Sequence, residues 1–155
     1  MQSAGRAFAA SEVSHRADER VAEFSLEIAH AYPREANLES WKRHLSYDRI
    51  RNEIELRDSY VLTKSVQRIT ETLMSACPVA QAAEGELTLD GGDLPGSKVR
   101  ILYDPRILSA SIEEIRITDS RLRSSWGNRL YRILLTSEQP KIRDVWTLRI
   151  VQQAQ

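Results

Sequence analysis

An arginine between two apolar residues recurs four times in the last third of the chain, and the second apolar residue is always isoleucine. The triplets are Val99-Arg100-Ile101, Ile115-Arg116-Ile117, Tyr131-Arg132-Ile133 and Leu148-Arg149-Ile150. Alternation of apolar and charged residues is typical of a half-buried β-strand. The arginines follow one another at steps of 16, 16 and 17 residues, which suits a strand and a short connection. We therefore predict an antiparallel meander with one arginine per strand on its polar face.

Turn-forming residues separate the strands of this predicted meander. Asp104-Pro105 ends the first arginine-bearing strand, and Trp126-Gly127-Asn128 and Glu138-Gln139-Pro140-Lys141 connect the later ones. A short edge strand is also predicted before the first triplet. The four to five predicted strands cover about 86–89, 98–104, 113–123, 129–137 and 144–152.

The first half of the chain has a different pattern, in which apolar residues recur at three- and four-residue steps as on amphipathic helices. The first stripe begins after Ser11, a potential N-cap, and ends at Tyr32-Pro33, because the residue before proline avoids helical backbone. A second helical region begins near Asn37, and Pro78 ends the third. Helices are therefore predicted at about 11–32, 37–57 and 59–76. The alternation in Ile54-Glu55-Leu56-Arg57 leaves a strand open as the alternative there.

This order of elements predicts an α+β domain, with the N-terminal helices packed on one face of the C-terminal antiparallel sheet. A length of 155 residues suits one domain with a sizeable core. Residues 1–10 are small and polar and are predicted to be a flexible leader. Residues 11–155 are predicted to form the single α+β domain.

The last two predicted strands are apolar on both parities, although a sheet with one solvated face should alternate more cleanly. Leu130 and Leu134 lie on the second parity of one strand, and Val145 and Val151 on that of the other. These four residues are the predicted interface. They indicate self-association or a protein partner that covers part of the second face.

Three arginines form the predicted binding cluster. A two-residue turn at Gly127-Asn128 would place Arg123 opposite Arg132, and a turn near Gln139-Pro140-Lys141 would place Arg132 opposite Arg149. Like charges opposite one another are destabilising, so this cluster would need acids between the arginines or a bound anion. The alternative is a solvated face on which arginine stems cover apolar surface.

Composition narrows the class of protein. With 41% apolar and 28% charged residues the chain has a globular composition rather than that of a disordered protein. Its net charge of zero argues against a dedicated nucleic-acid-binding protein. Residues 1–90 carry 11 Lys and Arg against 15 Asp and Glu, whereas residues 91–155 carry 11 against 7. This split would suit self-association or an acidic partner of the basic half.

The single cysteine, Cys77, excludes an intrachain disulfide, which slightly favours the cytoplasm. A periplasmic location stays open if an upstream signal or anchor belongs to the protein. No stretch of the sequence approaches the ~20 apolar residues that span a bilayer.

The sequence contains no motif that predicts catalysis, a metal or a cofactor. His15, His30 and His44 form no short metal-binding pair, and Cys77 has no ligand partner at zinc-site spacing. A glycine-rich phosphate loop and a nucleophile elbow are absent from the sequence. We therefore expect no metal and no cofactor, and incline against an enzyme.

Three functions remain as hypotheses. The leading one is a non-enzymatic binding or assembly module, a subunit of a larger bacterial protein complex. Its main alternative, by analogy of layout, is an NTF2-like enzyme or small-ligand-binding domain. That alternative has a pocket between helices and sheet, with His30, His44, Asp58 or Tyr60 as weak candidates. A second alternative is an anion or nucleic-acid site on the arginine-bearing sheet face.

Overall fold

A computed structural model describes residues 5–92 and 98–152 of the chain. Strands make up 60% of the structure against 11% helical residues, and α1 (Ser120–Trp126) is the one helix of at least seven residues in this part of the chain. The predicted α+β class is therefore wrong. The ranges predicted as helices, 11–32, 37–57 and 59–76, contain β-strands and short 3₁₀ turns instead.

The chain divides into two units. The first contains the residues up to Arg68 together with Gln139–Arg149, and the second contains Ile69–Glu138 and the residues from Ile150 onward. Of the predicted leader and single domain, residues 1–4 and 153–155 lie outside the described residues. Strand pairing within the described chain gives a sheet of eight strands and a sheet of three.

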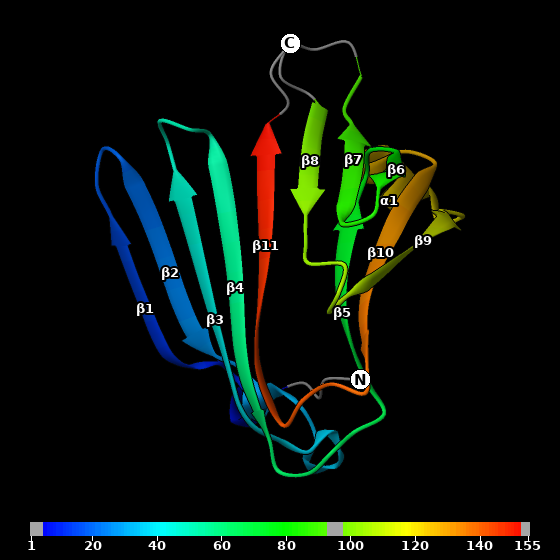
Figure 1. The fold of residues 1–155 in the computed structure, drawn as a ribbon. Helices are drawn as coiled ribbons and strands as arrows, with labels where there is room; N and C mark the ends of the chain where they lie inside the picture. The colour runs from blue at the N-terminus through cyan, green and yellow to red at the C-terminus, as the bar shows by residue number, and fades with distance from the viewer. Residues whose placement is uncertain (1–4, 93–97, 153–155) are drawn as a thin grey trace. The chain divides into compact units, whose positions relative to one another are not determined.

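The first unit is a run of antiparallel hairpins joined by a strand from the other end of the sequence. Its strand order is β1-β2-β3-β4-β11, which Figure 1 shows as neighbouring arrows from blue to green, followed by red. Three 3₁₀ turns precede or connect these strands. The elements are η1 (Arg6–Phe8), β1 (Ser11–Ala17), β2 (Val21–Glu27), η2 (Ala29–Ala31), η3 (Arg34–Ala36), β3 (Leu38–Asp48), β4 (Glu53–Leu62) and β11 (Arg143–Gln152).

Aspartates form the hairpin turns of this unit. The Asp18 carboxylate accepts hydrogen bonds from the Arg20 and Val21 amides at 2.8 and 2.7 Å. Asp48 likewise accepts from the amides two and three residues later, and Asn52 then adopts a φ of 51°. Asp and Asn side chains favour such turns because they satisfy local amides and tolerate left-handed backbone.

One face of this sheet holds an aromatic core. Trp41 on β3 lies opposite Tyr60 on β4, and their rings stack at 5.3 Å. Trp146 on β11 meets both rings edge-on, at 5.7 and 5.1 Å. All three side chains are buried, so the aromatic core of this face is built from three strands, β3, β4 and β11.

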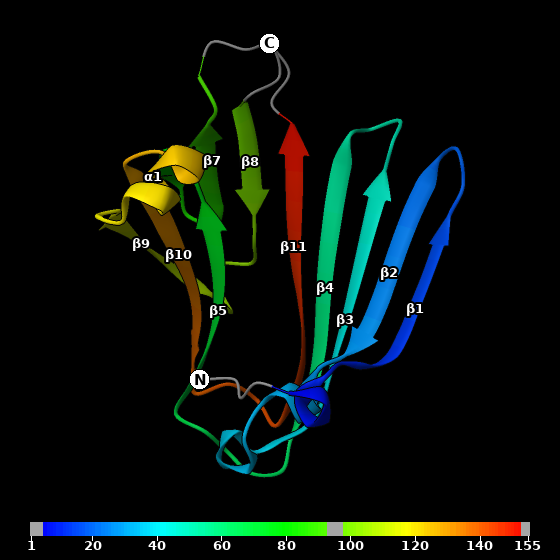
Figure 2. The same cartoon turned by 180° about the vertical axis from the view of Figure 1, so that it is seen from behind.

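The second unit contains two antiparallel groups of strands and the helix. The strands β6, β7 and β8 form a meander, and β5, β10 and β9 form the three-stranded sheet. Figure 2 shows α1 beside β10, the strand that it precedes. Besides α1, the elements are β5 (Arg68–Ser75), β6 (Val79–Ala83), β7 (Glu86–Asp90), β8 (Lys98–Leu102), β9 (Ser109–Arg116) and β10 (Arg129–Glu138).

Each of the five ranges predicted for the C-terminal sheet overlaps a strand, but the pairing of these strands differs from a single meander. The predicted strand 113–123 is split, since β9 ends at Arg116 and α1 begins at Ser120. The strands β10 and β11, expected to be neighbours, belong to different sheets. Part of the connecting sequence predicted between Asp90 and Lys98, residues 93–97, lies outside the described residues.

The charge split along the sequence does not coincide with the two units. The first unit contains 14 Lys and Arg against 12 Asp and Glu, and the second contains 8 against 10. Residues 139–149 of the basic half belong to the first unit and add Lys141, Arg143 and Arg149 to it. Neither unit is therefore strongly charged. The acidic–basic argument for self-association is therefore weakened.

Candidate functional site

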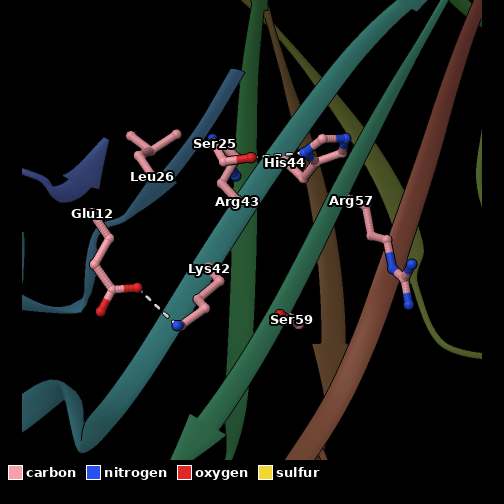
Figure 3. Close-up of a pocket in the computed structure, with 8 residues that line it drawn as sticks. All are labelled: Glu12, Ser25, Leu26, Lys42, Arg43, His44, Arg57 and Ser59. Carbon is pink, nitrogen blue, oxygen red and sulfur yellow. Dashed lines mark hydrogen bonds and ion pairs between the residues drawn. The ribbon is translucent and has the colours of Figure 1, made fainter. Parts of the chain in front are cut away.

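A groove of about 290 Å³ lies on the sheet of the first unit. The antiparallel register places Ser25 of β2 opposite His44 of β3, and His44 opposite Arg57 of β4. The next polar pair along the sheet is Lys42 opposite Ser59. Figure 3 shows the lining side chains, which are Glu12, Ser25, Leu26, Lys42, Arg43, His44, Arg57 and Ser59.

A serine and a histidine are hydrogen-bonded at one end of the groove. The Ser25 hydroxyl lies 2.8 Å from Nδ1 of His44. A carboxylate oxygen of Glu23 lies 3.9 Å from Nε2 of the same ring, beyond hydrogen-bonding distance. The three groups are those of a hydrolytic triad, but the third member does not fix the imidazole.

The surrounding backbone argues against acyl transfer at this serine. The strands β2 and β3 each lie between two partners, so their amides are directed into the ladders on both sides. A tetrahedral intermediate needs free donors for its oxyanion, commonly backbone N–H groups. We therefore regard the Ser25–His44 pair as polar lining of the groove.

An ion pair lies at the other end of the groove. The Lys42 ammonium donates to the Glu12 carboxylate at 2.8 Å, as Figure 3 shows. This hydrogen bond raises the pKa of Lys42 above its usual value. Glu12 has a φ of 50° beside a register shift in β1, so a bulge in the edge strand brings its side chain to the groove.

Arg57 is the cation of the groove that has no side-chain hydrogen bond or ion pair with any other described residue. It is exposed, and in Figure 3 its guanidinium points away from His44. Arg43 is different, because it donates from Nε and Nη2 to the fully buried Asp58 at 2.8 and 2.5 Å. The groove therefore has one uncommitted guanidinium and one tied to the core.

No protein-family model matches the chain, and no curated protein matches it.

The arginines predicted as a cluster lie in separate environments. Arg149 on β11 donates to both carboxylate oxygens of Glu53 on β4, at 2.6 and 2.9 Å. These hydrogen bonds hold the pKa of Glu53 below its usual value. Arg132 on β10 pairs with Glu113 directly opposite it on β9. Both arginines thus have the acid that a row of cations would require.

Arg123, the third predicted member, lies in α1 rather than opposite Arg132. The helix begins after Asp119, whose carboxylate accepts from the Arg121 and Leu122 amides at 2.8 and 3.2 Å. It ends at Gly127, whose φ of 80° suits glycine. The Arg123 side chain has no hydrogen bond or ion pair with the rest of the described chain.

Every residue of α1 is exposed. Leu122 and Trp126 are four positions apart and therefore share one side of the helix, and each is 53% exposed. Arg121 and Arg123 flank this apolar stripe. The helix thus presents an unburied apolar surface edged by guanidinium groups.

The four predicted interface residues are neither fully buried nor freely exposed as a group. Leu130 and Leu134 are half-buried on β10, opposite Ile115 and Ser111. Val145 is 39% exposed and Val151 is half-buried. Their role in an interface stays a prediction.

Sequence reasoning missed the groove and α1. The groove was missed because the spacing of apolar residues in the strands that form it predicts helices. For α1 a signal existed, since Asp119 and Gly127 are favourable residues just before and just after a helix.

The residues of the structure from 5 to 92 and from 98 to 152 contain no group of three His, Cys, Asp or Glu arranged to hold a metal. Within the same residues, no helix is long and apolar enough to cross a membrane.

Proposed function

We propose that this chain is a non-enzymatic protein-binding module that docks a partner through α1. The observation that carries the proposal is a helix with no buried residue that nevertheless presents Leu122 and Trp126 on one side. An NTF2-like pocket between helices and sheet is not proposed, since the helices that would form it are strands.

Helix energetics support a docking role. A seven-residue helix is too short to be stable in water on its own, and helices in proteins are stabilised mainly by packing an apolar face. The structure gives α1 an N-cap and a glycine end, but none of its residues is buried. A partner that covers Leu122 and Trp126 would supply the missing burial.

The chemistry of the surface indicates the kind of partner. Tryptophan and arginine are the side chains most enriched among residues that dominate protein–protein binding energy. Arg123 and Arg116 have no side-chain partner among the described residues, and Arg121 pairs only with its cap residue Asp119. We therefore propose an acidic protein surface with an apolar pocket that receives Trp126.

Site-specific photo-crosslinking in the native cell tests this proposal. A photoreactive amino acid at position 122 should give one discrete cross-linked protein, and the same group at position 50 should not. Ile50 is a matched control because it is 74% exposed on a hairpin of the first unit. The Arg121→Glu/Arg123→Glu variant should abolish the product, because it places like charges against an acidic partner.

Two results would contradict the proposal: no product from position 122, or equal products from positions 122 and 50. Trp126→Ser serves as a folding control. It should leave the urea midpoint unchanged, because Trp126 is not part of the core.

A further inference from the structure

We infer that the groove of the first unit is a binding site for a small ligand that carries an oxyanion, either phosphate or carboxylate. This site uses the strands β1–β4 and is independent of the docking role proposed for α1.

The groove concentrates hydrogen-bond donors and positive charge. Lys42, Arg57, His44 and two serine hydroxyls line it, against the carboxylate of Glu12. The Glu23 carboxylate is not part of the lining but lies 3.9 Å from Nε2 of His44. Ser59, like Arg57, has no side-chain partner among the described residues. Guanidinium, ammonium and hydroxyl groups are the usual partners of phosphate and carboxylate oxygens.

The size of the groove selects a small ligand. Its volume of about 290 Å³ is at the lower limit of typical ligand sites. Arg57 must turn toward the groove to reach a ligand there. An exposed arginine with no partner rotates freely, so this movement breaks no interaction with the described residues.

Glu12 occupies the position that we assign to the ligand's oxyanion. Its carboxylate accepts from Lys42 across the intervening strand β2, 30 residues away in sequence. Both side chains of this ion pair are mostly exposed, at 59% and 64%, and such pairs are weak. A ligand anion can therefore replace the Glu12 carboxylate at Lys42, which makes Glu12 an internal competitor.

The Ser25–His44 hydrogen bond then has a binding role. It orients the imidazole beside Lys42 and Arg57 without requiring a covalent step. Binding an anion that does not react needs no oxyanion hole, so the side chains that line the groove are sufficient.

Titration of the full chain with inorganic phosphate and, separately, with acetate tests the inference, with amide chemical shifts as the readout. At low ionic strength either probe should shift the amides of residues 42–44 and 57–59 saturably. Arg57→Ala should weaken binding about tenfold or more. Arg34→Ala is the matched control, since Arg34 is an exposed arginine of the same unit outside the groove, and it should leave the affinity unchanged.

Glu12→Gln should strengthen binding, whereas Glu39→Gln, a change of an exposed carboxylate outside the groove, should not. Absence of saturable shifts with both probes would overturn the inference, as would equal effects of Arg57→Ala and Arg34→Ala. An unchanged affinity in Glu12→Gln would refute the competitor role of Glu12. Because these titrations do not involve α1, their outcome is separate from that of the cross-linking experiment.

Discussion

At the scale of single residues, the structure separates charges that hold the fold from charges on its surface. Asp58 is fully buried on β4, and both its oxygens accept from Arg43 on β3. Arg132 and Glu113 form a similar pair between neighbouring strands, but each side chain is 44% exposed. Both pairs join a guanidinium to a carboxylate, but the first is much less exposed to solvent and uses both carboxylate oxygens, whereas Arg132 donates twice to one oxygen of Glu113.

Asp58→Ala should therefore lower the free energy of unfolding by about 3–5 kcal/mol, because it removes one partner of an ion pair whose carboxylate is fully buried. Glu113→Ala should lower it by about 1 kcal/mol or less, as for exposed pairs. Urea denaturation of both variants measures the difference. Similar losses would show that burial does not govern these pairs. The double variant Arg43→Met/Asp58→Leu should recover much of the loss, because it removes both buried charges together.

The arginines show how far the sequence could identify individual site residues. The alternating triplets correctly indicated that Arg132 and Arg149 lie on strands. Their partners Glu113 and Glu53 could not be predicted, because strand register depends on turns and bulges that the pattern does not specify. The groove residues carry no sequence signal of their own, since Ser25 and His44 meet only through the pairing of β2 with β3.

At the scale of elements, the apolar residues of the first hairpin have the sequence spacing that is typical of an amphipathic helix. Val13 and Ala17 lie on β1, and Val21 and Phe24 lie on β2, yet together they have the three- and four-residue steps of a helical stripe. The turn that interrupts the stripe depends on Asp18, a polar residue that also occurs on helix surfaces. The alternation in Ile54-Glu55-Leu56-Arg57 was the more reliable signal, because these residues lie on β4, where every second residue from Leu56 to Leu62 is buried.

The helix α1 depends on its cap to an unusual degree, because no residue in it is buried. Asp119→Ala removes the acceptor of two amides and should reduce the helicity of residues 120–126. Backbone carbon chemical shifts measure this local change. The urea midpoint of the whole chain should stay nearly constant, and Asp119→Asn should retain the helix. A large fall in global stability would show that α1 contributes to the core despite having no buried residue.

At the scale of the whole molecule, the pH dependence of stability should be set by carboxylates whose charged form is more stable in the folded protein than in the unfolded chain. The pKa values of Asp18, Asp48, Asp119, Glu27 and Glu53 lie below their usual values, mostly through hydrogen bonds from amides or arginine, although burial opposes the lowering at Glu27. Arg106 lowers the pKa of Asp104 to about 2. These carboxylates contribute fully to the unfolding free energy at pH values above their pKa values in the unfolded chain.

Unfolding free energy should therefore fall as the pH drops from about 4.5 toward 2, since the unfolded chain binds the protons first. Urea midpoints across this range measure the effect, and a midpoint independent of pH would refute it. Arg149→Gln should reduce the acid-dependent loss, because Glu53 would then titrate nearer its ordinary pKa.

Tyr60 should make the stability of the fold depend on pH at the alkaline end. Burial, with a smaller contribution from Asp144, raises its pKa to about 12, and its hydroxyl has no hydrogen-bond partner among the described residues. The folded state therefore keeps this proton longer than the unfolded chain does. Stability should be unaffected below about pH 10 and should decline as the pH rises from there toward 12. Phenolate absorbance should show a late-titrating component, which Tyr60→Phe removes.

The place of β11 beside β4 has a consequence for how the chain folds during synthesis. The hairpins β1–β4 are local in sequence and form early, but Trp146 leaves the ribosome long after Trp41 and Tyr60 have been made. Until then the two rings lack their third partner, and β4 has a free edge of the kind that recruits other chains. The first unit is therefore completed only after most of the second has been translated. Its slowest folding step should be the docking of this last strand, a contact of high sequence separation.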